Sequence, residues 1–213
     1  MRAWRFPLMI LLFSSATTLA AAINGGASFG LSRLGPLASS RQRHEREKRS
    51  LGCSDASFHA LAWRAMDFYF HSYITYSTPS HQVVGGWVVF NLSNTALPFE
   101  MGCSATSAQP QDFFYSNQWY RCQGPDTKTA DAALFSFDRS AGRLSVNQSW
   151  VCEDDQWPTI FNASGATNMT LDCTTSQWQN QNWTAGEIYS NEIVDCAVKN
   201  VTIQPIALEA YSA

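Results

Sequence analysis

The acidic run Glu153-Asp154-Asp155 follows Cys152 directly and contains the residue types that hydrolyse glycosidic bonds. Glycoside hydrolysis needs two carboxyl groups that face each other across a cleft, roughly 5–10 Å apart, one of them with a raised pKa. Neighbouring residues at the end of a strand point in different directions and more often cap a turn. The run supports a secreted polysaccharide hydrolase as the alternative interpretation, whereas we predict that the chain has no catalytic residue.

Other residues that could act in catalysis or bind a metal lack the necessary pattern. The histidines His59, His71 and His81 are 12 and 10 residues apart, which matches no metal-ligand motif. The sequence contains no Gly-x-Ser-x-Gly motif for a nucleophilic serine. Because the cysteines are even in number, all of them can pair, and no free thiol is expected as a nucleophile. We therefore predict no enzymatic activity, no metal site and no cofactor.

Aromatic residues in a polar context suggest a binding surface instead. Trp178 and Trp183 lie in TTSQWQNQNWTAGE (Thr174–Glu187), which we predict to be a Gln- and Asn-rich loop between strands. An exposed indole beside amides can stack on a sugar ring or form the centre of a protein interface. The competing interpretation is that these rings cover the ends of the folded domain as part of its core. If they are exposed, protein and glycan partners are equally compatible with these residues.

The first 49 residues are predicted to comprise a signal peptide, residues 1–22, and a propeptide, residues 23–49. Arg2 and Arg5 precede a short apolar run, and small residues follow up to Ala22, which is the order of regions in a signal peptide. The apolar run is far shorter than the roughly 20 residues that span a bilayer, so we expect no membrane anchor. Residues 23–49 form a basic propeptide that ends in the processing pair Lys48-Arg49. The predicted product is one secreted, extracellular domain of residues 50–213.

Removal of this segment makes the domain strongly acidic. The chain has 14 basic and 17 acidic residues, and residues 1–49 hold 8 and 2 of them, which leaves 6 basic and 15 acidic residues and a formal charge of −9. Such a surface repels phosphate backbones and anionic lipid headgroups. We therefore exclude nucleic acid as a partner.

All six cysteines lie in this predicted secreted domain, which indicates disulfide bonds. No pair has the close Cys-x-x-Cys spacing of a structural zinc site. Cys103 and Cys122 bracket one polar segment. Cys152 and Cys173 each end an alternating strand of inward parity, and Cys53 and Cys196 would join the terminal strands. Within a monomer we therefore favour the pairs Cys103–Cys122, Cys152–Cys173 and Cys53–Cys196.

Alternating apolar and polar residues predict antiparallel strands. Ala133–Asp138 and Leu144–Cys152 flank the turn-rich RSAGR and predict a β-hairpin. Phe58–Tyr76 is ambiguous, because its Ala-rich start could be helical and its aromatic end favours a strand. Pro205 would sit at an edge or end a strand. The further predicted strands are Gly85–Ser93, Asn168–Cys173 and Asn200–Leu208. The fold class is all-β, a compact antiparallel barrel or sandwich stapled by disulfides.

Six N-glycosylation sequons support this register. Four of the asparagines oppose the apolar residues of a predicted strand in parity and so face solvent, where a glycan must be. The other two lie in predicted loops. We predict a glycoprotein with most sequons occupied, at Asn91, Asn147, Asn162, Asn168, Asn182 and Asn200.

Several short motifs in this order resemble a known fungal family. They are AWRAMDFYF (Ala62–Phe70), VVFNLSN (Val88–Asn94), MGCSATS (Met101–Ser107), NQWYRC (Asn117–Cys122) and ALFSFD (Ala133–Asp138). Together they resemble the family of the Alternaria major allergen, which comprises small secreted β-barrel proteins. The resemblance implies a barrel, a Cys103–Cys122 disulfide and an allergen-, elicitor- or effector-like role with no established enzymatic activity. The spacing of Cys173 and Cys196 departs from the family, whose last two cysteines lie close together.

The function that follows is a non-catalytic secreted protein that binds a host or cell-wall component, either a protein or a glycan. Trp178 and Trp183 are the candidate binding residues.

Overall fold

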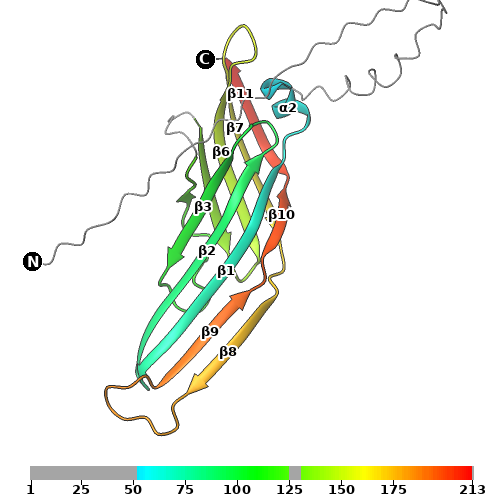
Figure 1. Ribbon diagram of the computed structural model, residues 1–213. Coiled ribbons are helices and arrows are strands. Elements are labelled where there is room, and N and C mark those ends of the chain that lie inside the picture. The colour runs from blue at the N-terminus through cyan, green and yellow to red at the C-terminus, as the bar shows by residue number, and fades with distance from the viewer. Residues whose placement is uncertain (1–51, 125–130, 213) are drawn as a thin grey trace, which may run out of the picture. The chain divides into compact units, whose positions relative to one another are not determined.

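The computed structural model describes residues 52–124 and 131–212. These residues belong to the second of two units, which divide the chain between Lys48 and Arg49. The predicted signal peptide, the propeptide and the processing pair lie outside the described residues. The described part contains a short helix, α2 (Cys53–His59), and eleven strands in two antiparallel sheets (Figure 1). Within it, no helix is long and apolar enough to cross a membrane.

The first sheet is built around one long strand, β1, and has the order β3-β2-β1-β9-β8. One edge of β1 pairs along its whole length with β2, and the other edge pairs first with β10 and then with β9. The strands of this sheet are β1 (Trp63–Thr78), β2 (His81–Asn94), β3 (Glu100–Ser107), β8 (Cys173–Gln179), β9 (Ser190–Cys196) and β10 (Lys199–Ile203).

The second sheet has the order β11-β7-β6-β5-β4. The predicted hairpin is confirmed at its centre, where Phe135 of β5 pairs with Val146 of β6. Its strands are β4 (Tyr120–Arg121), β5 (Ala132–Asp138), β6 (Arg143–Cys152), β7 (Thr159–Asn168) and β11 (Pro205–Ser212).

The ambiguous segment Phe58–Tyr76 is a strand from Trp63 onward, in β1. Its Ala-rich start is not helical, because α2 ends at His59 and residues 60–62 form the connection. A β-bulge then interrupts the alternation between Ala65 and Phe68, where Asp67 has a positive φ of 55°. The bulge shifts the inward positions from Trp63 and Ala65 to Phe68 and Phe70, all of which are fully buried. One extra residue therefore explains why the sequence shows no single strand period here.

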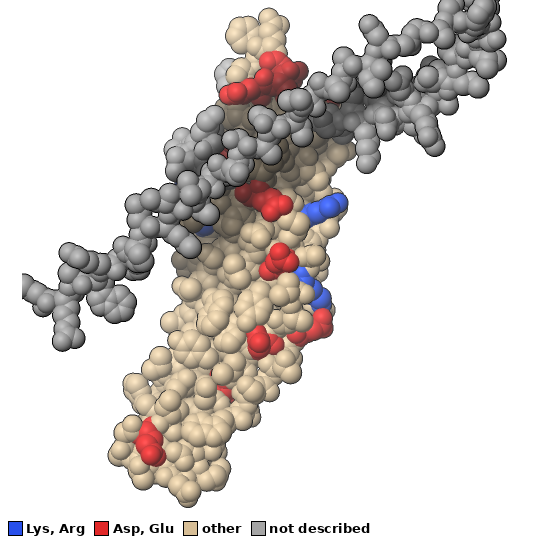
Figure 2. Space-filling view, in the orientation of Figure 1, with Lys and Arg blue, Asp and Glu red and all other residues tan. Residues whose placement is uncertain are grey.

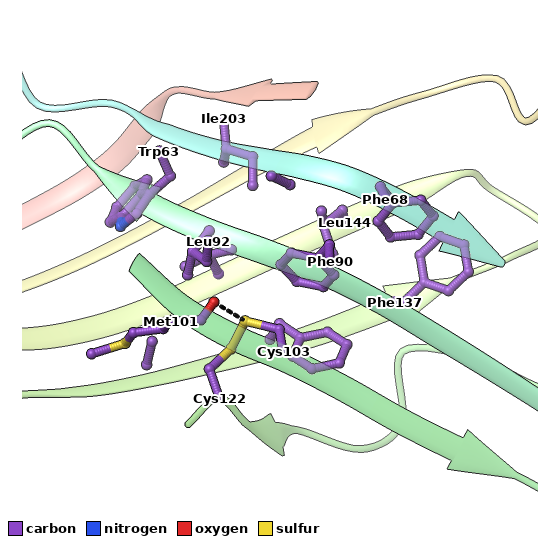
Figure 3. Close-up of a cluster of buried hydrophobic side chains, with 14 of the residues drawn as sticks. Trp63, Phe68, Phe90, Leu92, Met101, Cys103, Cys122, Phe137, Leu144 and Ile203 are labelled. Atoms are coloured by element: carbon purple, nitrogen blue, oxygen red, sulfur yellow. Dashed lines mark hydrogen bonds between the residues drawn. A yellow bond between two sulfur atoms is a disulfide. The ribbon is translucent and has the colours of Figure 1, made fainter. Parts of the chain in front are cut away.

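The core lies between the two sheets and is rich in aromatic rings. Both sheets contribute residues to the cluster in Figure 3, which includes Phe90 from β2 and Phe137 and Leu144 from β5 and β6. Phe68 packs edge-on against Phe137 with ring centroids 5.2 Å apart. Full burial of each such side chain stabilises the fold by roughly 1.5–3 kcal/mol.

The sheets face each other as a sandwich and do not close into a barrel within the described residues. They are joined along one side, where the backbones of Gly102 and Gln123 exchange hydrogen bonds of 2.8 and 2.7 Å. The neighbouring Cys103–Cys122 disulfide reinforces the same side. The all-β prediction is confirmed, and of its two forms the sandwich fits.

Two predicted strands are wrong at the places where the chain changes sheet. The segment predicted as Asn168–Cys173 is a connection, since β7 ends at Asn168 and β8 begins at Cys173 in the other sheet. The segment predicted as Asn200–Leu208 is divided at Gln204 into β10 and β11. Pro205 begins the edge strand β11, which agrees with the position predicted for it.

All six cysteines form disulfides, and Cys103–Cys122 is confirmed. The predicted pairs Cys152–Cys173 and Cys53–Cys196 are wrong, because the bonds are Cys53–Cys152 and Cys173–Cys196. The change of sheet after β7 carries Cys173 away from Cys152 and sets it opposite Cys196 in the β8–β9 ladder. Cys53 lies in α2 rather than on a terminal strand, and its Cα is 5.5 Å from that of Cys152 at the end of β6.

Candidate binding site

The two candidate tryptophans lie in a disulfide-closed hairpin that we call the β8–β9 hairpin, residues 173–196. Cys173 pairs with Cys196 at its base, and Trp178 pairs with Asn191 near its tip. β9 attaches the hairpin to β1, whereas β8 is the outermost strand of the sheet. The prediction of a loop over Thr174–Glu187 is therefore wrong up to Gln179, because this stretch is the edge strand β8.

Trp178 is an exposed residue of this edge strand. Its exposed fraction is 55%, and all seven residues of β8 are exposed. Trp63 and Trp150, by contrast, are fully buried in the core. Edge strands are commonly protected by Lys or Pro residues or by a bulge. β8 contains no Lys and no Pro. The interpretation of Trp178 as a core residue therefore fails.

Trp183 holds the loop of the hairpin in shape. Its side chain is half-buried, its Nε1 donates a hydrogen bond of 2.9 Å to the carbonyl oxygen of Glu187, and its ring meets Tyr189 edge-on at 5.9 Å. The carboxylate of Glu187 in turn accepts hydrogen bonds from the Asn180 side chain at 3.2 Å and the Thr184 backbone at 3.1 Å. Trp183 is thus a positioning residue of the loop, and Trp178 is the freely exposed ring.

A hollow of about 260 Å³ lies where the hairpin meets the end of β1. Tyr76 is opposite Ser190, and Gln177 is opposite Glu192. These pairings place most side chains of the hollow on the same face of the sheet as the core residues nearer the middle of β1. In Figure 1 this part of the sheet extends beyond the strands of the other sheet. The lining residues are Tyr76, Gln177, Trp178, Gln179, Ser190, Asn191 and Glu192. The sequence signalled only the amides beside Trp178, because the β1 and β9 residues join them through strand pairing.

Hydrogen bonds fix the two glutamines of this hollow. Gln177 donates its Nε2 hydrogen to Glu192 Oε2 at 2.8 Å, and Gln179 donates to the hydroxyl of Tyr189 at 2.7 Å. Each amide therefore keeps its carbonyl oxygen as an acceptor, and Glu192 keeps a second carboxylate oxygen. The hollow presents ordered polar groups on the same face of the sheet as the ring of Tyr76, whereas Trp178 lies on the opposite face of β8.

The hairpin carries negative charge only. Residues 173–196 include Glu187, Glu192 and Asp195 and contain no Lys or Arg. Figure 2 shows acidic side chains scattered along the face in view, with basic ones in a few places. Asp195 accepts a hydrogen bond of 2.6 Å from the hydroxyl of Tyr69, which lowers the pKa of Asp195 and raises that of Tyr69. The hairpin is therefore a poor site for anionic ligands.

One residue of the acidic run that defined the hydrolase hypothesis, Asp154, is hydrogen-bonded to helix α2. Asp154 accepts hydrogen bonds from the Ser54 hydroxyl at 2.6 Å and the Ser54 backbone N–H at 3.0 Å, in the first turn of α2. These bonds lower the pKa of Asp154. A general acid needs the opposite shift, toward a higher pKa. Asp154 thus has the properties of an ionised hydrogen-bond acceptor for Ser54.

The three histidines lie on separate elements. His59 ends α2, His71 stacks on Trp87 with ring centroids 4.1 Å apart, and His81 begins β2 with its Nδ1 2.8 Å from the Ser77 hydroxyl. His71 Nδ1 also lies 3.5 Å from a carboxylate oxygen of Asp195. Within residues 52–124 and 131–212, no three His, Cys, Asp or Glu side chains form a potential metal site.

The sequon asparagines are exposed at five positions and half-buried at one. Asn162 is the half-buried one, and it lies within β7 rather than in the predicted loop. Its Nδ2, the atom that would carry a glycan, donates a hydrogen bond of 3.1 Å to Tyr211. Asn182 lies in the loop of the β8–β9 hairpin, as predicted.

A comparison with protein families identifies the chain. The family model AltA1, described as Alternaria alternata allergen 1, matches residues 66–199, which is more than half of the chain. No curated protein and no solved structure matches it significantly. The match covers the strands that resemble the allergen family and extends to the β8–β9 hairpin. The chain therefore belongs to the AltA1 family of Alternaria-type allergens.

Proposed function

We propose that this family member is a non-catalytic secreted protein that binds a host or cell-wall component through the β8–β9 hairpin. The observation that carries the proposal is the exposed indole of Trp178 on an unprotected edge strand. The Cys173–Cys196 disulfide and the Trp183 hydrogen bond restrict the conformations of this hairpin. This restriction reduces the conformational entropy that is lost on binding. An exposed tryptophan on a rigid element is typical of a binding hot spot.

The hydrolase alternative has weaker support. Its acidic residue Asp154 is engaged with Ser54 and has a lowered pKa, and the chain belongs to a family described as an allergen. If the protein cleaved polysaccharide through this run, changing Asp154 and Asp155 together to Asn would abolish the cleavage. We expect no polysaccharide cleavage by the wild-type protein, as measured by release of reducing ends.

The test of binding compares two exposed tryptophans. Trp178→Ala and Trp157→Ala each remove an exposed indole, and Trp157, with an exposed fraction of 65%, lies in the loop before β7, outside the hairpin. Retention of the secreted protein on plant cell-wall material and on immobilised apoplastic proteins is measured for both variants and the wild type. Loss of an anchoring tryptophan typically costs about 2 kcal/mol or more, some thirtyfold in affinity.

We expect Trp178→Ala to weaken retention by about that factor and Trp157→Ala to leave it unchanged. Equal retention of all three proteins, or a loss with Trp157→Ala alone, contradicts the proposal.

A further inference from the structure

We propose that the hollow between the β8–β9 hairpin and the end of β1 binds a neutral oligosaccharide. The inference rests on the proposed function and adds the chemical class of the ligand. None of the seven lining residues is basic or aliphatic. Five of them share one face of the sheet: Tyr76, Gln177, Gln179, Ser190 and Glu192, that is, one aromatic ring, two amides, one hydroxyl and one carboxylate. Trp178 and Asn191, which pair with each other, alternate with them and lie on the opposite face at the rim. This set matches a ligand that has many hydroxyl groups and a flat apolar ring face.

The free hydrogen-bonding groups are of the kinds that bind sugar hydroxyls. Gln177 and Gln179 each use one Nε2 hydrogen within the protein, and their carbonyl oxygens remain as acceptors for hydroxyl donors. Glu192 offers a further carboxylate oxygen, and hydrogen bonds to a charged acceptor are the stronger ones. The hydroxyl of Ser190 can both donate and accept. Gln177, Gln179 and Glu192 already make hydrogen bonds within the protein before the ligand arrives.

Charge and size argue against the other ligand classes. A phosphate or a uronic acid would meet Glu192 in a hairpin that has no Lys or Arg. A protein side chain that anchors an interface would need apolar walls, which this hollow lacks apart from the ring of Tyr76. The volume of about 260 Å³ is slightly below the range of small-molecule sites, about 300–1,000 Å³, and suits one or two sugar rings of a longer chain.

The experiment is a calorimetric titration of the secreted protein. The neutral probes are hexamers of β-1,4-linked glucose, β-1,3-linked glucose and β-1,4-linked N-acetylglucosamine, and the charged control is a hexamer of galacturonic acid. We expect at least one neutral hexamer to bind and the galacturonic acid hexamer to bind at least tenfold more weakly. Absence of binding by all three neutral probes, or equal binding of the charged one, overturns the inference.

Two variants connect the binding to the hollow. Gln177→Ala removes one amide, and Thr174→Ala is its control on the opposite face of the same strand. Glu192→Gln removes the carboxylate, and Glu209→Gln is its control on β11 in the other sheet. We expect each hollow variant to weaken binding about tenfold and each control to have no effect, with unchanged thermal unfolding in all four. Binding that is unaffected in both hollow variants overturns the inference.

The result separates this inference from the proposed function. If no neutral hexamer binds while retention of the protein still depends on Trp178, the oligosaccharide inference fails and the proposed binding function stands. If a hexamer binds through Gln177 while Trp178→Ala leaves retention on wall and apoplastic material unchanged, the role of Trp178 fails and the oligosaccharide site stands.

Discussion

Gln148 shows how one polar residue is accommodated in the middle of the apolar core. Its Oε1 accepts hydrogen bonds from Trp63 Nε1 at 2.6 Å and from Asn94 Nδ2 at 2.9 Å. Asn94 in turn accepts a hydrogen bond from the backbone of Ala96. Gln148 is almost fully buried, so these bonds replace the water that each group loses on folding. The parity of Leu144, Val146 and Trp150 already places this residue on the inner face, although its partners come from other strands.

We predict that Gln148→Leu destabilises the domain, because it leaves two buried donors without an acceptor. Each unsatisfied donor costs about 1–3 kcal/mol. Urea unfolding should therefore show a lower midpoint with an unchanged slope. Gln82→Leu, at an exposed position of β2, is the control. Equal midpoints for the two variants would mean that the network contributes nothing to stability.

Asp154 should make the stability of the domain depend on acid pH. Its hydrogen bonds with Ser54 lower its pKa in the folded state below the ordinary value of 3.8. The contribution of these bonds is therefore present above pH 3.8 and is lost as the pH falls through the lowered pKa. We predict that Asp154→Asn is less stable than the wild type at pH 7 and that the difference shrinks at about pH 2. Asp155→Asn, which removes the same charge at the next position, should show no such convergence.

At the scale of elements, the two disulfides that the sequence did not predict constrain different parts of the fold. Cys53–Cys152 ties α2 to the end of β6 across a separation of 99 residues, and Cys173–Cys196 closes the hairpin across 23. In the chain-entropy model, loops of these lengths stabilise the fold by about 4.7 and about 3.4 kcal/mol.

We predict that Cys53→Ser/Cys152→Ser lowers the unfolding temperature more than Cys173→Ser/Cys196→Ser does. The second variant should instead lose retention on wall and apoplastic material while its core stays folded, because it frees the base of the binding hairpin. Thermal unfolding and the retention assay on both double variants decide this. A hairpin variant that is the less stable of the two and still binds normally would contradict it.

The elements that the sequence predicted correctly are those that a short turn connects. Ala133–Asp138 and Leu144–Cys152 had to pair, because a turn of a few residues leaves no other neighbour. Alternation also located Gly85–Ser93 within β2. It failed at Met169–Asp172 and at Gln204, because alternation reports which face of a strand is buried and not which sheet the strand joins. The wrong disulfide pairs followed from this same gap.

At the scale of the whole molecule, the candidate site was predicted only in part. The amides around Trp178 identified the correct segment. That this segment is a strand, and that Tyr76 and Glu192 line the same hollow, depends on the pairing between β1, β9 and β8. Trp183 could not be assigned its positioning role, because its contacts with Glu187 and Tyr189 require the geometry of the loop.

Processing of the chain remains a prediction at this scale. We expect the protein to be secreted and its mature form to begin at Ser50, because the pair Lys48-Arg49 precedes the domain and follows the predicted signal peptide. N-terminal sequencing of protein from a culture supernatant tests it. A first residue of Ala21 or Ile23 would show that the basic segment is retained, and the acidic charge of the secreted form would then be much smaller.

We propose the β8–β9 hairpin as the binding surface of the protein. Hydrogen–deuterium exchange of the secreted protein, free and bound to the wall or apoplastic fraction that retains it, tests this most directly, since it reports on each segment of the backbone. Because β8 is an exposed edge, its unpaired amides should exchange quickly in the free protein and more slowly on binding. The predicted result is protection concentrated in residues 174–192. Protection around α2 and residues 153–157, with none in the hairpin, would contradict the account.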